Sequence, residues 1–360
     1  MLFKFLALMI LLTPAYLSAS EREVINAYEV TNVDANVLRQ IADLFEITDR
    51  TGNTFTVYVP MPQIETFTRL TRKYKLIKHD INKELQQSLI TDNNEFTGYR
   101  SYSNIQEELA QMQRDHPDTV RIITYGKSRN GRDLQAIKLS DNVMESEGDT
   151  ENKILITAAM HGDEIITTEV ILNLLNELLI GFQTFNPRLQ AMITDNEIYI
   201  IPVTSPDSFI RRSRYTHGYV DPNRQFPWPE KPNRNPIACI NNLMEFAKSL
   251  KIDGYLDIHA YGKMIMYPWA FTLQPIKDPA MENMFDELTT FMAEENNYRH
   301  GSIAKTIYVA KGSSVDYFHW ILDSKAIAVE LGREKAPRAR DISKIVNQSR
   351  EMLWRFIESF

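Results

Sequence analysis

The amino-acid sequence predicts a mixed α/β fold: a largely parallel, twisted sheet with helices on both faces, preceded by a small α+β unit of ferredoxin-like order. Two observations lead to this prediction. From residue 153 onward, short apolar runs of strand type alternate with longer segments whose apolar residues recur at helical spacing. Such alternation is typical of sheets that helices cover on both faces. Residues 23–80 carry a separate set of shorter patterns ahead of a polar segment.

The first unit has the order β-α-β-β-α-β. Its apolar residues alternate in the strand segments and recur at helical spacing in the helix segments. We expect strands at residues 24–30, 54–59 and 74–79, and helices at residues 34–45 and 62–73. A fourth strand within residues 44–59 completes the order and gives a small α+β sandwich.

The second unit begins after a polar segment with little periodicity. Ser103 and Gln106 form a candidate capping box for its first helix. Asn130-Gly131 predicts a hairpin turn between strands at residues 120–124 and 134–139. The segments that follow alternate in type. We expect strands at residues 154–159, 197–203, 254–258 and 326–330, and helices at residues 164–180, 237–250, 281–294 and 342–357.

The N-terminus is typical of an exported protein. It combines Lys4, an apolar run over residues 5–12 and small residues at Ser18 and Ser20, which is the pattern of a secretory signal peptide. The run is shorter than the about 20 apolar residues that cross a bilayer. We therefore expect a secreted or periplasmic protein. The predicted domains are 1–20 (signal peptide), 21–85 (small unit), 86–98 (linker) and 99–360 (large unit).

The bulk composition argues against two classes of partner. The chain has 360 residues, a net charge of -7 and one cysteine, Cys239. A net negative chain without a basic cluster offers little to nucleic acid or to anionic membranes. We expect no nucleic-acid partner and no membrane association. The single cysteine also excludes an intrachain disulfide.

Three residues predict a metal centre. His161 and Glu164 lie where the strand at 154–159 gives way to the next helix, and their spacing lets both side chains face one point. His259 follows the strand at 254–258. Two imidazoles and one carboxylate suit zinc and leave a fourth position open, as in catalytic zinc sites. We therefore expect one Zn2+ per chain.

Two further clusters supply groups for a hydrolytic reaction. Glu330 ends the last predicted strand, where a carboxylate is costly to bury without a role, and it is the candidate general base. Arg211, Arg212 and Arg214 can bind a carboxylate or stabilise an oxyanion. Asp221 can accept a hydrogen bond from the outer ring nitrogen of a metal-binding histidine.

Together these segments resemble the zinc metallocarboxypeptidases of the carboxypeptidase A/B type. The likeness covers nearly the whole mature chain, in the same order. It begins at Tyr99-Arg100-Ser101-Tyr102 and continues through Tyr125-Gly126-Lys127-Ser128, Gly131-Arg132 and the His161-x-x-Glu164 motif. The resemblance implies hydrolysis of the C-terminal peptide bond, with His161, Glu164 and His259 as zinc ligands and Glu330 as general base.

The resemblance also implies a role for each remaining candidate. It implies that Arg211 polarises the scissile carbonyl, with Arg212 and Arg214 left open as alternatives, and that Asp221 supports the first zinc histidine. The implied substrate contacts are Asn223 and Arg224 at the terminal carboxylate, Tyr261 along the subsites, Tyr308 as a mobile cover, and Val315 at the floor of the side-chain pocket.

The small unit is similar to the activation domain of this family. The similarity implies a zymogen in which this unit docks over the cleft until a protease removes it. The segment between Lys83 and Arg100 contains neither Lys nor Arg, so a trypsin-like protease has no site inside it. An apolar Val315 at the pocket floor implies a preference for apolar or aromatic C-terminal residues. The expected partners are peptide or protein C-termini and an activating protease.

Three other functions stay open at this point. Asp163 stands in place of an arginine found in digestive members, and His-Gly-Asp-Glu also occurs in relatives that trim bacterial cell-wall peptides. A peptidoglycan stem-peptide (diaminopimelate) amidopeptidase is therefore one alternative, although Val315 offers no ionic partner for such a substrate. A non-catalytic peptide-binding module on the same fold is another. In the third, the small unit is a permanent partner-binding domain.

Overall fold

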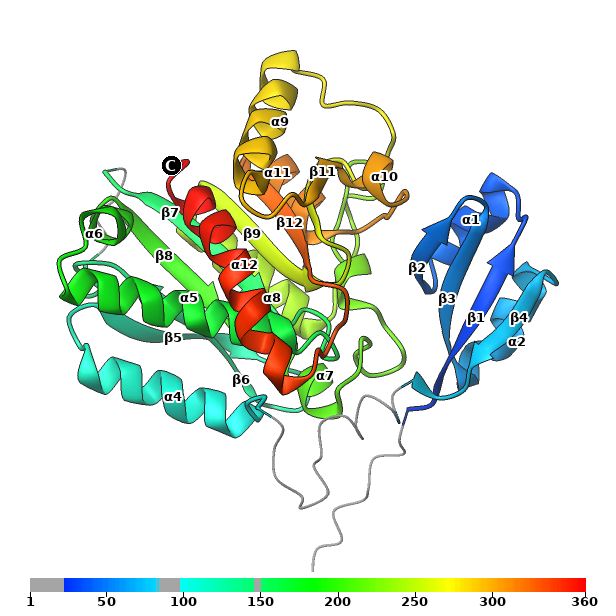
Figure 1. Ribbon diagram of the computed structural model, residues 1–360, viewed down its shortest axis with the longest axis horizontal. Coiled ribbons are helices and arrows are strands. Elements are labelled where there is room, and N and C mark those ends of the chain that lie inside the picture. The colour runs from blue at the N-terminus through cyan, green and yellow to red at the C-terminus, as the bar shows by residue number, and fades with distance from the viewer. Residues whose placement is uncertain (1–22, 82, 84–97, 146–149) are drawn as a thin grey trace, which may run out of the picture.

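The computed structural model describes residues 23–81, 83, 98–145 and 150–360. Figure 1 shows two bodies, a small N-terminal unit (residues 23–81) and a larger main unit (residues 98–145 and 150–360). The predicted signal peptide and nearly all of the predicted linker lie outside the described residues. Within the part of the chain that is described, no helix is long and apolar enough to cross a membrane.

The N-terminal unit is a four-stranded antiparallel sheet with two α-helices packed against it. Its strand order in the sheet is β2-β3-β1-β4, and its strands and α-helices follow each other along the chain in the predicted β-α-β-β-α-β order. Asp34 starts the first helix by accepting hydrogen bonds from the backbone N–H groups of Asn36 and Val37. The elements are β1 (Ile25–Thr31), α1 (Ala35–Ala42), β2 (Glu46–Thr51), β3 (Thr54–Pro60), η1 (Met61–Gln63), α2 (Ile64–Leu70) and β4 (Tyr74–Lys78).

The main unit is built on a mixed sheet, as predicted, and this sheet has eight strands. Its strand order is β11-β10-β12-β9-β7-β8-β6-β5. The four central strands β12, β9, β7 and β8 run parallel, and the pairs β10-β12, β6-β8 and β5-β6 are antiparallel. The strands are β5 (Val120–Lys127), β6 (Asp133–Leu139), β7 (Asn152–Ala158), β8 (Asn196–Ile201), β9 (Gly254–Ala260), β10 (Met264–Tyr267), β11 (Arg299–Ser302) and β12 (Lys325–Leu331).

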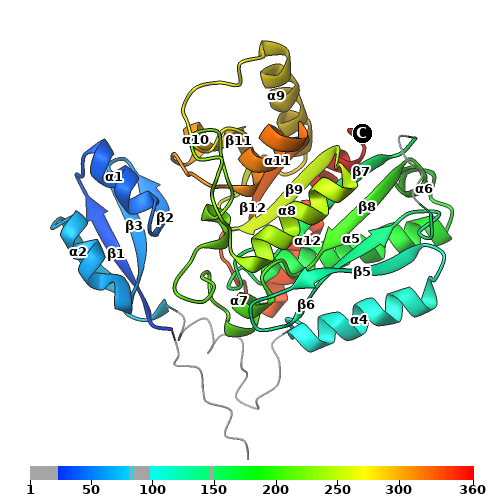
Figure 2. The same ribbon diagram turned by 180° about the vertical axis from the view of Figure 1, so that it is seen from behind.

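Helices cover both faces of this sheet (Figures 1 and 2). Successive strand residues point to opposite faces, so Ile154 and Ile156 pack in one hydrophobic cluster and Leu155 in the other. Helices α4, α5, α6, α9 and α12 contribute to the first cluster, and α8, α10 and α11 to the second. The helices are α4 (Tyr102–Asp115), α5 (Ile166–Gln183), α6 (Pro187–Thr194), α7 (Pro206–Arg211), η2 (Pro222–Arg224), α8 (Ala238–Leu250), α9 (Pro279–Ala293), α10 (Ile303–Thr306), α11 (Ser314–Leu322) and α12 (Ala339–Ile357).

The carboxyl ends of the central strands meet at one edge of the sheet. β7 ends just before His161, β9 contains His259, and β12 contains Glu330. His259 and Glu330 are paired directly in register across β9 and β12. Ligand sites of open α/β sheets form at this edge, and the fold therefore brings together residues that are far apart in the sequence.

The structure differs from the sequence-based expectation in several short segments. The first helix of the main unit, α4, is capped by Ser101, so the capping box expected at Ser103 was wrong. The hydroxyl of Ser101 accepts from the N–H of Asn104, whose side chain accepts from the N–H of Ser101. Six short helices and strands of the main unit were not expected, because so few residues carry too little periodicity to be recognised. They are α6, α7, β10, β11, α10 and α11, and the short 3-10 helix η2 was not expected either.

Candidate active site

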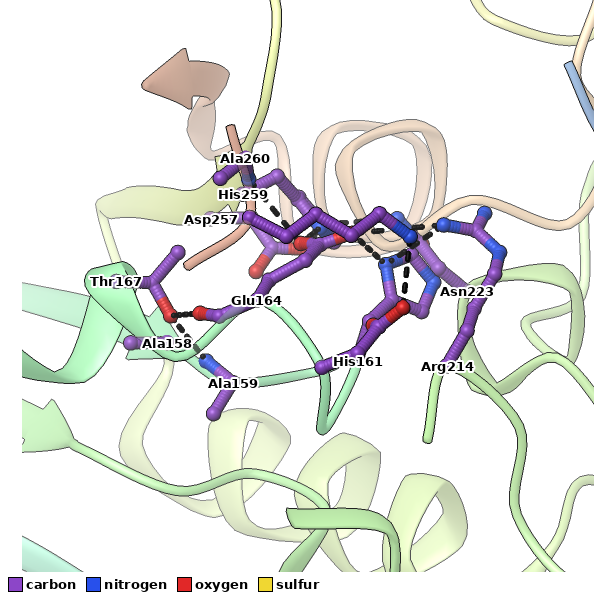
Figure 3. Close-up of polar contacts among 12 residues, drawn as sticks. Ala158, Ala159, His161, Glu164, Thr167, Arg214, Asn223, Asp257, His259 and Ala260 are labelled. Carbon is purple, nitrogen blue, oxygen red and sulfur yellow. Dashed lines mark hydrogen bonds and ion pairs between the residues drawn. The ribbon is translucent and has the colours of Figure 1, made fainter. Parts of the chain in front are cut away.

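The loop between β7 and α5 carries two of the three candidate metal ligands. Thr167 ties this loop together: the N–H of Ala159 donates to its hydroxyl at 3.1 Å, and the hydroxyl donates to the carbonyl of Glu164 at 2.7 Å (Figure 3). Gly162 is required by close packing, since a Cβ atom there would lie 2.1 Å from the backbone carbonyl carbon of Ser208. The loop therefore presents His161 and Glu164 in a fixed geometry.

His161, Glu164 and His259 converge on one point (Figure 3). Nδ1 of His161 lies 2.8 Å from Oε1 of Glu164, and Nδ1 of His259 lies 2.9 Å from Oε2 of the same carboxylate. One donor atom from each residue lies within 4.8 Å of the others, and all three residues are buried. The fold thus assembles the three residues for which the sequence predicted a metal centre.

Two aspartates hold the outer nitrogens of the histidine rings. Nε2 of His161 lies 3.0 Å from Oδ1 of Asp221, and Nε2 of His259 lies 3.0 Å from Oδ2 of Asp257. A ring that donates from Nε2 keeps the lone pair of Nδ1 for a metal. Asp221 was expected in this place. Asp257 was missed, although its position two residues before His259 in β9 puts both side chains on the same face.

The charges of this cluster favour a cation. Burial alone would raise the pKa of Glu164, but His161 and His259 outweigh it and hold that pKa well below its usual range. Burial would likewise raise the pKa of Asp221, yet Arg214 and His161 lower it strongly. Glu164 and Asp221 therefore stay ionised, and the two imidazole nitrogens and the carboxylate of Glu164 fit zinc.

Of the three arginines that the sequence left open, Arg214 lies beside the three metal-ligand candidates. Its Nη1 is 3.1 Å from Nδ1 of His161 and 3.4 Å from Oε1 of Glu164. Its Nη2 pairs with Oδ2 of Asp221 at 2.9 Å. The guanidinium is buried, and these carboxylates raise its pKa although burial opposes them. Arg214 can therefore donate to an oxygen that becomes negative beside the metal ligands.

Arg211, which was expected in this role, points elsewhere. Its Nη2 donates to the backbone carbonyl of Tyr215 at 2.9 Å, and it lines a cavity of about 300 Å³ that contains none of the three metal-ligand candidates. The difference arises where α7 ends. Arg212 adopts a left-handed conformation with φ of 53°, which turns the chain so that Arg214 reaches the cluster.

The two residues expected to bind a terminal carboxylate lie beside His259. Nδ2 of Asn223 is 3.1 Å from Nε2 of His259, and its Oδ1 accepts from the N–H of Ser314 at 2.9 Å. Arg224 donates from Nη2 to the hydroxyl of Tyr308 at 3.1 Å. Its buried Nε has no hydrogen-bond partner among the described residues. The guanidinium thus keeps a donor for a ligand carboxylate.

Val315 is buried in the second hydrophobic cluster, one residue after the start of α11. The neighbouring Asp316 accepts hydrogen bonds from the backbone N–H groups of Ala270 and Phe271 at 2.7 and 2.9 Å. These bonds tie α11 to the segment after β10. The carboxylate of Asp316 is therefore occupied by backbone donors.

Glu330 extends from β12 next to the metal-ligand candidates. Burial raises its pKa to about 8, and the charge of Glu164 adds to the rise, whereas His259 and Arg214 oppose it. A carboxyl group with a raised pKa near neutral pH is suited to accept a proton and to return it. The sequence predicted Glu330 as the general base, and this role stays a prediction.

The N-terminal unit reaches this edge of the main sheet through its edge strand β2 and the adjacent β3 (Figures 1 and 2). Glu46 of β2 lies 2.7 Å from Lys335 and 3.6 Å from Arg214. The hydroxyls of Tyr58 and Tyr261 are 3.5 Å apart. Tyr308 packs against the hydrophobic cluster of the N-terminal unit. The resemblance implied that this unit docks over the cleft, but the residues in contact were not predicted, because no local pattern marks a contact between such distant segments.

Comparison with known proteins finds carboxypeptidases. A family model described as zinc carboxypeptidase matches residues 105–352. The chain is 30% identical over 262 residues to a zinc carboxypeptidase of Saccharothrix mutabilis subsp. capreolus, a match that covers 61% of this chain and 59% of that protein. It is 24% identical over 323 residues to carboxypeptidase A1 of Rattus norvegicus, and this match covers 76% of each chain.

Solved structures share the fold over nearly the whole chain. Carboxypeptidase A from Helicoverpa armigera matches with a TM-score of 0.71 at 17% identity, over 93% of this chain and 97% of that one. Thrombin activatable fibrinolysis inhibitor matches with a TM-score of 0.70 at 15% identity, over 94% and 98%. At such low identity these likenesses show the fold alone.

Proposed function

The chain belongs to the zinc carboxypeptidase family, and we propose that it is exported as a zymogen and releases apolar or aromatic residues from peptide C-termini. As a family member it is a zinc-dependent peptide hydrolase that acts at the C-terminal bond. The observation that carries the proposal is the grouping at one sheet edge of three metal-ligand candidates, the base Glu330 and the Asn223-Arg224 pair.

In the proposed mechanism, His161, Glu164 and His259 hold zinc. When bound, zinc lowers the pKa of a water molecule and polarises a carbonyl. Glu330 accepts the proton of the attacking water and then donates it to the leaving amine. Arg214 donates hydrogen bonds to the carbonyl oxygen as negative charge develops on it.

The same proposal gives the substrate-binding residues their roles. Asn223 and Arg224 bind the terminal carboxylate, and the free Nε of Arg224 supports this role. Tyr308, whose hydroxyl accepts a hydrogen bond from Nη2 of Arg224, closes over the substrate. Tyr261 contacts the preceding residues. Asp221 keeps His161 in the tautomer that presents Nδ1.

The preference for apolar C-terminal residues rests on Val315. A buried valine offers no charge to a lysine, arginine or diaminopimelate side chain in the pocket. Asp257 is a second nearby carboxylate beside Asp316, but Ser314 and Thr157 donate to it at 2.5 and 2.8 Å and His259 lies beside it. Its charge is therefore committed within the protein.

The zymogen proposal rests on the contacts of the N-terminal unit with the site. Glu46, Tyr58 and the cluster around Tyr308 occupy the approach to Arg214, Tyr261 and Arg224. A substrate must displace them to reach the metal ligands. We further propose that residues 1–20 direct export. A protease that cuts in or near residues 86–98 then removes residues 21–85 and leaves residues 99–360 as the catalytic domain.

Mass spectrometry of a defined peptide mixture tests the proposed activity. The mixture contains peptides that end in Phe, Leu, Lys or Asp and is incubated with zinc-loaded protein, intact or cut at a protease site engineered into residues 86–98. We expect loss of single Phe and Leu residues only after the cut, and no loss with Glu330→Gln. Absence of trimming by every form would overturn the peptidase proposal, and trimming of Lys alone would overturn the proposed preference.

A further inference from the structure

A buried cation of the main unit, Lys335, lies where the N-terminal unit meets the candidate active site. Its side chain is 11% exposed, and its Nζ is 2.7 Å from Oδ2 of Asp163. The carbonyl of Lys335 accepts from the N–H of Ile166 at 3.3 Å. Backbone and side chain are thus both held by residues of the main unit. The main unit therefore supplies its own anchors for this lysine, apart from the contact with the N-terminal unit.

The other partner of this ammonium is a carboxylate of the N-terminal unit. Oε1 and Oε2 of Glu46 lie 2.7 and 2.8 Å from Nζ of Lys335, and Oε1 lies 3.6 Å from Nη1 of Arg214. Burial alone would raise the pKa of Glu46, but Lys335 and Arg214 outweigh it and lower that pKa. The main unit therefore accommodates a carboxylate that another part of the chain delivers.

The donors that hold Glu46 stay with the main unit when the N-terminal unit leaves. An ammonium has three N–H donors, of which Asp163 takes one and the two oxygens of Glu46 take the others. Asp163 offsets part of the positive charge of Lys335. In the intact chain the ammonium nevertheless contacts two carboxylates, those of Asp163 and Glu46. A cationic or purely apolar group in the place of Glu46 would leave a buried donor unpaired, at a cost in free energy. A carboxylate satisfies it.

A chain of side-chain contacts connects Lys335 to the three metal-ligand candidates. Asn223, next to Arg224, touches His259. Arg214 touches His161 and leads through Glu46 to Lys335, which in the described part of the chain has no hydrogen bond or ion pair with Asn223 or Arg224. A peptide with its terminal carboxylate at Arg224 and its last peptide bond at the metal ligands therefore extends its preceding residues toward Lys335.

We propose that Lys335, with Arg214 beside it, forms a subsite for an acidic side chain on the amino-terminal side of the scissile bond. The proposal rests on the peptidase activity proposed above. Glu46 fills this subsite in the intact chain, and an aspartate or glutamate of the substrate fills it once the N-terminal unit has left. The substrate class is peptides in which an acidic residue closely precedes the released residue.

The test compares matched peptides with the chain cut in the linker. The hydrophobic clusters of the main unit are built, within the described part of the chain, from residues 99–360 alone, so the cut leaves its core intact. The peptides end in the same apolar residue and carry Glu or Gln one or two positions before it. We expect kcat/KM about tenfold or more higher for Glu at one of these positions, as for a charged hydrogen bond. Lys335→Met is expected to bring the ratio of Glu to Gln near one.

Control variants decide what a change in this ratio means. Lys335→Arg keeps a cation and is expected to retain the preference, and Lys344→Met, which removes a charge from the exposed surface of α12, is expected to keep it in full. Lys335→Gln, which can still hydrogen bond to Asp163, replaces the methionine variant if that variant does not fold. A wild-type ratio near one at both positions, or a preference that survives loss of the lysine, would overturn the subsite. Absence of hydrolysis of every peptide would instead contradict the peptidase activity itself.

Discussion

Nη1 of Arg214 lies 3.1 Å from Nδ1 of His161, the ring nitrogen that faces the metal cluster. A guanidinium can only donate hydrogen bonds, so Nδ1 of His161 is the acceptor in this contact. The outer nitrogen of the same ring is turned to Asp221. Arg214 is therefore the arginine that lies beside the metal-ligand candidates. The sequence had left Arg211, Arg212 and Arg214 as three alternatives for this place.

We expect Arg214→Ala to lower kcat by about 10²- to 10³-fold, as for the loss of one donor to a developing oxyanion. Arg211→Ala is expected to leave kcat close to that of the wild type, because its guanidinium donates to the carbonyl of Tyr215. Steady-state kinetics on the cut chain, with the zinc content of each variant measured, checks both.

Arg214 also pairs with Asp221, so its loss can act through the metal site. Arg214→Lys keeps the charge and separates the two effects: an intact zinc content with a reduced kcat supports a direct role. A large loss of kcat in Arg211→Ala, with Arg214→Ala nearly normal, would restore the assignment made from the sequence.

Glu330→Gln is expected to lower kcat by about 10²- to 10⁴-fold, the range for loss of a general base, while zinc binding is retained. A glutamine has the same shape and no proton to exchange. Inductively coupled plasma measurement of zinc beside the rate assay checks the expectation. Loss of zinc together with activity would mean that Glu330 supports the metal site and is not the base.

The pH dependence of the rate gives a second measure of Glu330. Burial and the charge of Glu164 raise the pKa of Glu330 to about 8. The ionised form accepts the proton, so kcat/KM must fall as the pH is lowered through this pKa. The positive charge of bound zinc lowers the midpoint below 8, because it favours the carboxylate. A pH–rate profile of the zinc-loaded, cut chain that rises toward acid would contradict the role of Glu330 as a base.

Glu46→Gln is expected to raise the activity of the intact chain by about tenfold or more, because removal of one partner of a buried ion pair is strongly destabilising to the contact. The glutamine leaves Lys335 with Asp163 as its remaining ionic partner. Hydrolysis by the uncut protein, compared before and after the cut, checks this. Glu65→Gln on the exposed surface of α2 is the matched control, and its intact chain is expected to stay as inactive as the wild type. Equal activity of the two variants would show that Glu46 does not hold the N-terminal unit in place.

Most of the fold could be predicted because its long elements carry a clear period. The central strands are buried on both faces and the helices between them have broad apolar stripes, as at residues 154–158 and 166–183. The short elements β10, β11 and α11 escaped prediction, since each depends on neighbours in space. β10, for example, has four residues and is held between β12 and β11.

The residues of the candidate site also fall into a group that the sequence could predict and a group that it could not. His161, Glu164, His259 and Glu330 stand at strand ends where polar residues are conspicuous, and the sequence was sufficient to group them. The choice among the arginines depended on the left-handed turn at Arg212, which no spacing reveals. Glu46 and Lys335 are 289 positions apart, and their contact exists only because two separately folded units meet.

The aspartates behind the histidines provide the last prediction. Asp221 and Asp257 each accept from Nε2 of a histidine whose Nδ1 faces Glu164. We expect Asp221→Asn and Asp257→Asn each to lower zinc affinity by about 10- to 100-fold, the usual effect of losing a partner that orients a metal-binding histidine. An amide still accepts one hydrogen bond but carries no charge to favour the tautomer. Competition with a chromogenic chelator measures the affinity.

Asp257 also accepts hydrogen bonds from Ser314 and Thr157, so its loss can weaken the fold as well as the metal site. Thermal unfolding of the metal-free variants separates the two effects, and Asp286→Asn on the exposed surface of α9 is the control for loss of a single charge. A lower zinc affinity with an unchanged unfolding temperature of the metal-free protein assigns the effect to the histidines. Unchanged zinc affinity with a lower unfolding temperature would mean that these aspartates serve packing alone, and that Nδ1 of each histidine is presented to the metal by the backbone without their help.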